Sequence, residues 1–311
     1  MKNSPKSGRM TRRALLKRSG AAMLGAGMLA GGYASFWEPV QLDIVRPSFR
    51  CPRLPAAFDG IRIAHFSDLH LGFYSRKSVI ARLAEAIGSE TPDLVLFTGD
   101  AVDSEADALR EYLPLLASMN GTLGKFAILG NHDYMTRPDL VADMLKVAGF
   151  QVLRNGSALV ERRGEAIAIV GLDDGLKGFP DPAKGLGGVP DGLFTLLMMH
   201  EPDYADTAAA YPFDMQISGH SHGGQVRVPL IGAMLTPPGA RRYVMGAYAV
   251  GERAMPLLRQ PRHRRNPFAD TIPVHAGADH DDAEVGKRLN HVAMQRRGSG
   301  CSRKSFGFRP N

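Results

Sequence analysis

The feature that most constrains the fold is a series of short apolar runs that end in polar residues. Five such runs occupy residues 61–70, 93–100, 125–134, 193–203 and 213–222, and each reaches Asp, His or Asn at or near its end. Short apolar runs bounded by polar residues are typical of buried strands. In open α/β sheets, ligand sites lie beyond the carboxyl ends of the strands. The pattern therefore predicts sheets with a functional site assembled at one edge.

Stretches of helical periodicity separate the first three of these runs. Apolar residues recur at helical spacing over residues 78–90, and two further helices are expected at 105–119 and 140–149. The segment 151–174 is typical of hairpin-rich β structure, with Asn155-Gly156 as a turn. This order, βαβαβα and then mostly β, predicts an α/β fold of layered sheets that are parallel at their centre and carry helices outside.

The polar residues at the strand ends form a candidate metal-binding set. They are Asp68, His70, Asp100, Asp103, Asn131, His132, His200, His220 and His222. Every histidine between residues 66 and 255 belongs to this set. Carboxylate, imidazole and amide oxygen together suit Mn, Fe or Zn. The set is too large for one tetrahedral zinc and fits two ions that share a bridging carboxylate. Such a pair stabilises the attacking and leaving oxygens of a displacement at phosphorus.

The last two members of the set lie in the glycine-rich stretch SGHSHGGQVRVP, residues 218–229. Gly219, Gly223 and Gly224 permit close approach of the backbone to a ligand. In extended backbone, the imidazoles of His220 and His222 lean to the same side, as a metal pincer would require. Taken alone, the stretch also fits a glycine-rich turn with two exposed histidines.

The ordered motifs resemble those of the calcineurin-like metallophosphoesterases. They read Asp68-Leu69-His70, Gly99-Asp100-Ala101-Val102-Asp103, Gly130-Asn131-His132-Asp133, His200 and Gly219-His220-Ser221-His222. The flanking stretches FSDLHLG and GHSHGGQVRVPLIG resemble a small exported phosphodiesterase branch of that family. The resemblance covers about residues 40 to 255. It implies a four-layer α/β/β/α sandwich with mixed sheets and a dimetal site at the strand carboxyl ends.

The resemblance also implies a role for each residue. Asp68, His70, Asp100 and His222 would bind the first metal ion. Asp100 would bridge to a second ion held by Asn131, His200 and His220. His132 would protonate or stabilise the leaving oxygen, and Asp103 would orient it, since a neighbouring carboxylate favours the protonated imidazole.

The implied activity is metal-dependent phosphodiester hydrolysis by a hydroxide that bridges two divalent ions. Protein phosphatases of the superfamily carry Arg where this chain has Ser104, which disfavours a phosphoprotein substrate. One alternative is a pyrophosphatase acting on a nucleotide-linked acylated sugar, a lipid-linked phosphate of the lipid A precursor type. A non-enzymatic alternative is a membrane-tethered metal-binding protein.

Other polar residues near the motifs have simpler interpretations. We interpret His65 as a packed strand residue, and Glu201 and Asp203 as the start of the next helix. Asp173 and Asp174 are interpreted as a turn rather than as ligands.

The basic character of the chain belongs to its two ends. Of a net charge of +7, residues 19–255 carry −6, so no nucleic-acid-binding face is expected on the folded part. Residues 1–36 contain Arg12-Arg13 followed by an apolar stretch from Gly20 to Phe36, and they resemble a twin-arginine export signal. We therefore expect export by the twin-arginine machinery to the periplasm or the outer face of the membrane. Both a cleaved signal and an uncleaved membrane anchor remain open.

We expect three regions in the chain: the signal of residues 1–36, a catalytic domain of residues 37–255, and a tail of residues 256–311. The tail differs from the catalytic domain in composition. Its composition is basic and rich in Pro and His, without periodicity. Members of the resembled branch continue with further strands, and suitable synonymous codons read one nucleotide downstream over residues 259–286 restore their pattern and a stop. We hypothesise a frameshift near residues 254–256. The alternative is a genuine disordered basic tail, and the nucleotide sequence of the gene distinguishes the two.

Overall fold

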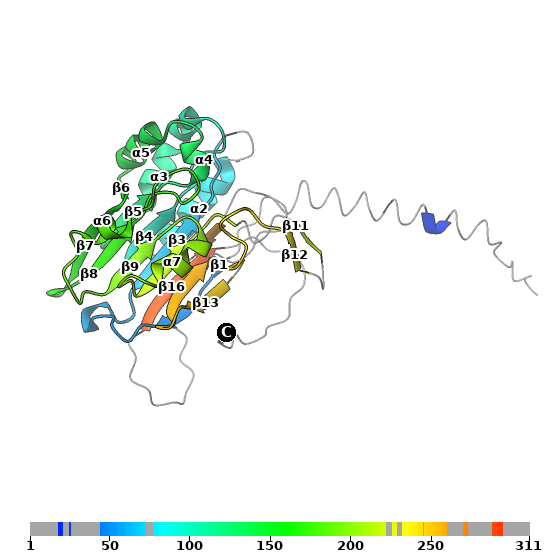
Figure 1. The fold of residues 1–311 in the computed structure, drawn as a ribbon. Coiled ribbons are helices and arrows are strands. Elements are labelled where there is room, and N and C mark those ends of the chain that lie inside the picture. Colours follow the sequence, from blue (N-terminus) through cyan, green and yellow to red (C-terminus); the bar gives the residue numbers. More distant parts are fainter. Residues whose placement is uncertain are drawn as a thin grey trace, which may run out of the picture.

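In a computed structural model, the chain folds into two packed β-sheets covered by helices (Figure 1). The structure describes residues 18–20, 25, 44–72, 77–221, 226–228, 232–244, 246–259, 270–272 and 288–294. Within this part of the chain, none of the helices has the length and apolar character needed to cross a membrane.

The first sheet contains the first three strands expected from the sequence. Its strands are β1 (Ile44–Val45), β2 (Ser48–Arg50), β3 (Arg62–Ser67), β4 (Leu94–Thr98), β5 (Gly124–Ile128), β6 (Gln151–Val152), β15 (Asp270–Ile272) and β16 (Arg288–Met294). The order is β1-β16-β3-β4-β5-β6, and every pair from β16 to β6 is parallel. Parallel pairing brings the carboxyl ends of β3, β4 and β5 to one edge.

The second sheet carries the later two expected strands. Its strands are β7 (Gly156–Arg162), β8 (Glu165–Gly171), β9 (Thr195–Met198), β10 (Met215–Ser218), β13 (Gly246–Val250) and β14 (Met255–Arg259), in the order β13-β14-β10-β9-β8-β7. Pairs β8–β9, β9–β10 and β10–β14 are parallel, whereas the two edge pairs are antiparallel. A separate pair joins β11 (Val226–Val228) to β12 (Gly232–Leu235).

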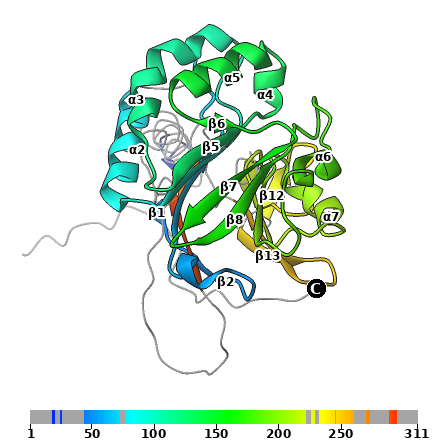
Figure 2. The same ribbon diagram turned by 90° about the vertical axis from the view of Figure 1, so that its left-hand side faces the viewer.

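Helices cover the outer face of each sheet, which gives the expected four layers (Figure 2). The helices α2 (Lys77–Glu90), α3 (Leu113–Ser118) and α5 (Pro138–Val147) pack on the first sheet. On the second sheet lie α6 (Pro182–Leu186) and α7 (Ala205–Ala208). Short helices η3 (Ala56–Phe58), η4 (Ala106–Tyr112), α4 (Asn131–Tyr134) and η5 (Pro202–Tyr204) lie in connections. The fold is therefore the α/β/β/α sandwich with mixed sheets.

The side chains of β4 point alternately to the two faces of the first sheet, and both faces are apolar. Leu94 and Leu96 pack between the two sheets, whereas Val95 and Phe97 pack under the helices. A strand that is apolar on both faces is covered on both sides, as parallel sheets require. The ring of Phe97 stacks on Phe66 of β3 with centroids 4.8 Å apart.

Two local expectations differ from the structure. The stretch 105–119 is split into η4 and α3, since Pro114 near the start of α3 lacks the N–H that a continuous helix would need. The hairpin turn between β7 and β8 lies at Arg163-Gly164, where both residues have positive φ, rather than at Asn155-Gly156. Asn155 instead connects β6 to β7, and therefore one sheet to the other.

The region after residue 255 contributes strands to both sheets. The boundary expected at residue 255 falls on the first residue of β14, whose Leu257 and Leu258 are buried. Of the remaining residues, the structure describes only the backbone of β15 and β16, which pair with β3. The frameshift hypothesis stays a prediction.

Candidate functional site

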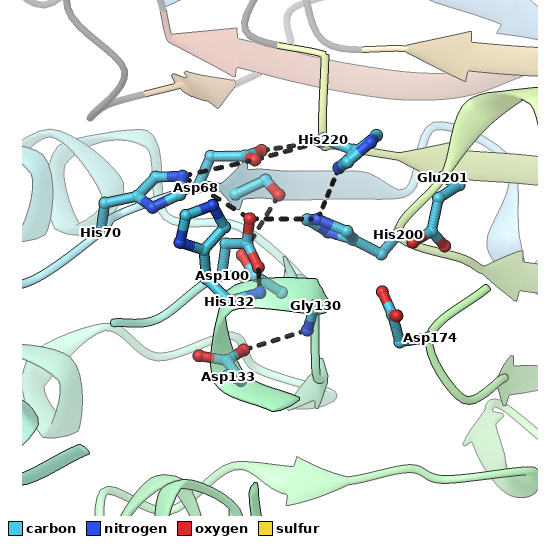
Figure 3. Close-up of polar contacts among 12 residues, drawn as sticks. Asp68, His70, Asp100, Gly130, His132, Asp133, Asp174, His200, Glu201 and His220 are labelled. Atoms are coloured by element: carbon cyan, nitrogen blue, oxygen red, sulfur yellow. Dashed lines mark hydrogen bonds and ion pairs between the residues drawn. The ribbon is translucent and has the colours of Figure 1, made fainter. Parts of the chain in front are cut away.

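Polar side chains from both sheets converge at the carboxyl ends of their strands (Figure 3). Asp68 and His70 follow β3, Asp100 and Asp103 follow β4, Asn131 and His132 begin α4 after β5, and His200 and His220 follow β9 and β10. The site expected from the motifs is thus brought together from five strands. His222 lies outside the described residues.

The backbone at this edge adopts conformations that side chains rarely favour. Asp68, His70, Asp100 and His220 have φ values of 55°, 43°, 55° and 72°. Non-glycine residues in this region are uncommon, and they cluster at active sites and ligand clamps. Four of the proposed ligands therefore sit on a backbone that the surrounding structure holds in an unfavourable state.

Glycines allow the loops to approach this closely. A Cβ added at Gly219 would lie 1.9 Å from the Ser67 hydroxyl oxygen and 2.6 Å from a carboxylate oxygen of Asp68. One added at Gly130 would lie 2.4 Å from Asp100 Oδ1. The motif glycines therefore clear space for the carboxylates.

The first group of candidate ligands surrounds His70. His70 Nε2 lies 3.6 Å from Asp100 Oδ2 and 3.9 Å from Asp68 Oδ1. Burial opposes protonation of His70, yet contacts with Asp103, Asp100 and Asp68 raise its pKa. His70, Asp100 and His132 offer ligand atoms close enough to share one ion.

The second group pairs His200 with His220. His200 Nδ1 lies 2.6 Å from the Thr98 carbonyl oxygen, and His220 Nε2 lies 2.7 Å from that of Pro238. Since a carbonyl only accepts, each of these nitrogens donates its hydrogen, which assigns the tautomer of the neutral ring. The remaining nitrogens, His200 Nε2 and His220 Nδ1, face each other at 3.2 Å. In the neutral rings these are two facing lone pairs, which a shared proton or a bound cation would satisfy.

Asp100 connects the two groups. Its Oδ2 lies 3.6 Å from His70 Nε2 and 3.3 Å from His200 Nε2, while its Oδ1 accepts a hydrogen bond from the His132 backbone N–H. Burial disfavours the charged form of Asp100, but His200, His70 and His132 hold its pKa far below the ordinary range.

Two oxygens at the site support the presence of ions. Asp100 Oδ2 and Asn131 Oδ1 are buried without a hydrogen-bond partner among the described residues. Buried oxygens without a partner are costly unless an ion or water satisfies them. The donor set therefore fits two divalent ions that share Asp100.

His132 lies on the more exposed side of the same cluster. Its Nδ1 donates to the backbone carbonyl of Asp103 at 2.9 Å, and the Asp103 carboxylate oxygen Oδ1 lies at 3.7 Å. The same Oδ1 lies 3.6 Å from His70 Nδ1. Asp103 therefore contacts both rings, and its closest contact with His132 is through the backbone. The Nδ1 donation leaves His132 Nε2 available for another partner.

Asp133, a residue with no role expected from the sequence, ties two of the loops together. Its Oδ2 accepts from the Gly130 N–H at 3.0 Å and its Oδ1 from the Val102 N–H at 3.1 Å. Burial and the charge of Asp100 raise its pKa to about 7. Its position directly after the motif Gly130-Asn131-His132 is the sequence feature that could have indicated a role at the site.

The carboxyl groups of Glu201 and Asp174 face each other next to His200 (Figure 3). Both side chains are buried, at 3% and 0% exposure. Burial and the contact with Asp174 raise the pKa of Glu201 well above its usual range. Asp174 also accepts from the Leu176 and Lys177 N–H groups, which agrees with the expected turn. Glu201 directly precedes η5 as its N-cap residue, close to the expected helix start, but its side chain is buried and does not cap the helix.

Asp203 anchors the segment that orients His220. Its carboxylate accepts from the backbone N–H groups of Arg241, Arg242 and Tyr243, and its own N–H donates to Gly239. This segment includes Pro238, whose carbonyl accepts from His220. Such contacts behind a ligand fix its ring orientation.

His65 lies behind the site as a fully buried strand residue, as expected. Its Nε2 lies 2.7 Å from the Thr98 hydroxyl, and burial lowers its pKa to about 3. It therefore stays neutral.

Comparison with known proteins gives consistent matches. Residues 61–224 match the calcineurin-like phosphoesterase family. The chain is 37% identical over 78% of its length to the uncharacterized metallophosphoesterase YkuE of Bacillus subtilis, covering 87% of that protein. It is 32% identical over 71% of its length to the phosphodiesterase YaeI of Escherichia coli, covering 82% of it. It is 29% identical over 67% of its length to the UDP-2,3-diacylglucosamine pyrophosphatase LpxG of Chlamydia trachomatis, covering 77% of it.

Proposed function

Because the chain belongs to the calcineurin-like phosphoesterases and is a hydrolase of phosphoric esters, we propose that its substrates are phosphodiesters. The observation that carries the proposal is the position of Asp100 Oδ2, which faces both imidazole groups without a hydrogen-bond partner among the described residues. Two divalent ions, when bound, neutralise phosphoryl charge and lower the pKa of water to near neutrality.

The motifs shared with the family assign the residues that would hold the ions. Asp68, His70, Asp100 and His222 would hold one ion, and Asp100, Asn131, His200 and His220 the other. Imidazole, carboxylate and amide ligands fit Mn, Fe or Zn, and the identity of the ions is part of the proposal.

His132 would act on the leaving group. Its Nδ1 is fixed by the Asp103 carbonyl, so its Nε2 can hold a proton toward the substrate oxygen that departs. Its half-buried position at the margin of the cluster supports contact with substrate rather than with metal. A positioned acid of this kind contributes about 10²–10⁴ in rate.

The experiment is metal analysis of the purified full chain, followed by turnover of a panel of substrates with Mn, Fe(II) and Zn. The panel contains diesters, monoesters and lipid-linked pyrophosphates. We expect two ions per chain and preferential hydrolysis of diesters. Bound ions without turnover of any substrate would instead support a metal-binding protein.

A second candidate activity is hydrolysis of a pyrophosphate that links a nucleotide to an acylated sugar. The observation that favours it is the similarity to the relative named for that activity. If the chain hydrolyses the lipid-linked pyrophosphates of the same panel faster than the diesters, this second activity is supported instead.

We also propose that the chain is exported by the twin-arginine machinery and works at the periplasmic or outer membrane face. The basic pair Arg12-Arg13 and the apolar stretch after it support this location. All but a few of these residues lie outside the described part. Fractionation of cells that carry R12K/R13K, with the unaltered chain as control, tests export.

A further inference from the structure

The loop between β8 and α6 exposes two large apolar side chains. Phe179 is 85% exposed and Leu176 is 40% exposed. Among the described large apolar residues, Phe179 has the greatest exposure. Single exposed apolar residues are common on proteins, so exposure alone does not mark a binding surface. The structure and the position of this loop carry more information.

Hydrogen bonds within the loop hold it in one shape. The Phe179 N–H donates to Asp173 Oδ2, and the Gly178 N–H donates to the Asp174 carbonyl. Asn155 accepts from the N–H groups of Asp173 and Asp181, and its amide donates to the Phe179 carbonyl at 2.7 Å. A loop with this many internal bonds is not an unfolded segment that exposes Phe179 by chance.

The same loop is hydrogen-bonded to two segments that lie next to the candidate active site. The Gly175 N–H donates to Glu201 Oε2 at 2.9 Å, directly beside His200. Asp173 of the loop also accepts a hydrogen bond from the hydroxyl of Tyr134, and Tyr134 lies two residues after His132 in the chain. The part of the loop that directly precedes Leu176 is therefore tied to segments that carry the site.

Two lysines accompany the apolar side chains. Lys177 lies between Leu176 and Phe179 in sequence, and Lys184 lies in α6; both are exposed, and neither forms an ion pair within the described residues. The nearby Asp181 is engaged as the cap of α6, where it accepts from the Lys184 N–H. Apolar residues beside cations are the composition that binds anionic membrane interfaces.

The shape of this surface favours a membrane over the acyl chain of one bound substrate. An acyl chain is held in an enclosed apolar groove, whereas Phe179 is almost fully open to solvent. A neighbouring cavity of about 460 Å³ is lined by Asp139, Asp143, Lys146 and Arg154 among others and includes neither Phe179 nor Leu176. Its charged lining does not suit an acyl chain.

We propose that the loop of residues 173–181 docks on an anionic bilayer, with Phe179 and Leu176 entering the interface and Lys177 and Lys184 contacting lipid phosphates. The dimetal site would then face phosphoesters carried by the same membrane. The effect of docking on catalysis rests on the proposed function, whereas docking itself can be measured without turnover.

Docking is tested by fluorescence of the full chain. Trp37 is the single tryptophan, so W37F/F179W carries one reporter in the loop, and W37F/V147W carries a matched reporter at a site of 76% exposure on α5. Vesicles contain phosphatidylglycerol with phosphatidylcholine, or phosphatidylcholine alone, with doxyl-labelled lipid as quencher. We expect a blue shift and quenching for W37F/F179W with the anionic vesicles only, and no change for W37F/V147W. Equal responses of the two variants, or none for W37F/F179W, would overturn the proposal.

A kinetic comparison separates membrane docking from contact with a single substrate. L176S/F179S should hydrolyse a water-soluble diester at the unaltered rate and a vesicle-embedded phosphoester at least about tenfold more slowly, because burial of even one such side chain stabilises binding by about tenfold or more. V147S/L159S is the control with two exposed apolar residues removed elsewhere. An equal loss on a monomeric short-chain phospholipid would show contact with the substrate itself and contradict docking. Absence of turnover in the unaltered chain would contradict the proposed function and leave the fluorescence result standing.

Discussion

At the scale of single residues, the proposed ligands differ from His132 in where they lie. His200 and His220 each donate one ring hydrogen to a carbonyl, and their other ring nitrogens face each other. His132 makes the same kind of donation, to Asp103, but lies nearer the surface. Substitution of His132 should therefore affect the protein differently from substitution of His200 or His220.

Replacement of His132 by Ala should lower kcat by about 10²–10⁴ while both ions stay bound, because it removes a proton donor and no proposed ligand. The loss should shrink for substrates with very good leaving groups, which need no proton. The measurement is turnover with a series of leaving groups, together with metal content. Loss of an ion from H132A would show that His132 is a ligand.

Glu201 provides a second test at this scale. E201Q keeps a group that can donate to Asp174 and accept from Gly175, so it should bind both ions as the unaltered chain does. E201L has a similar volume but removes the polar contact with Asp174 and leaves the Gly175 N–H without its acceptor, and an unpaired buried N–H costs about 1–3 kcal/mol. We expect E201L to show weaker metal binding and a lower Tm. If E201Q binds metal as weakly as E201L, the acid pair is not what positions this part of the site.

At the scale of elements, the site depends on how closely the ends of β3 and β10 approach. The Ser67 hydroxyl and the Asp68 carboxylate occupy the space that any side chain at Gly219 would need. The His220 N–H donates to both oxygens of Asp68, so the two loops hold each other in place.

Substitution G219A should therefore separate these loops. Overpacking of a buried contact costs about 1–3 kcal/mol, which lowers Tm by several degrees and should also weaken metal binding. The matched control is G164A, because Gly164 has no atom near its missing Cβ, although its positive φ carries its own strain. Thermal unfolding and metal titration of both variants give the comparison; normal metal affinity in G219A would contradict the importance of this contact.

The sequence predicts the elements that have strong periodicity and clear ends. Helices α2 and α5 and the five site-bearing strands lie within a few residues of expectation, because alternation and helical spacing record which face is buried. The register between the sheets and the turn at Arg163-Gly164 depend on long-range packing, which local patterns do not encode. The contacts of Asp133 with Val102, of Glu201 with Gly175 and of Asp203 with residues 241–243 could not be predicted for the same reason, since these partners are distant along the chain.

At the scale of the whole molecule, bound ions and protons compete for the same groups. In the metal-free protein, burial opposes the charge of His70 and His200, but surrounding carboxylates raise the pKa of both above the ordinary value of 6.5. The stabilisation from these raised pKa values is fully present below 6.5 and is lost as pH rises through the folded-state values. Asp133 and Glu201, whose pKa values are also raised, change stability in the same direction.

Metal-free protein should therefore lose thermal stability as pH rises above about 6.5. Metal binding needs deprotonated imidazole, so its affinity should increase over the same range with release of protons. The difference in Tm between loaded and metal-free protein should widen with pH. Calorimetry in buffers of different ionisation enthalpy measures the released protons, and a difference in Tm that narrows with pH would contradict this assignment.

The most direct test of the account is the metal stoichiometry of D100N, measured beside its turnover. Asp100 Oδ2 faces both candidate ligand groups, and the amide of Asn would replace a shared anion with a neutral group. We predict that D100N retains its fold, binds fewer than two ions per chain and loses most of its phosphodiesterase activity. Two ions per chain with unchanged turnover in D100N would contradict the shared dimetal site.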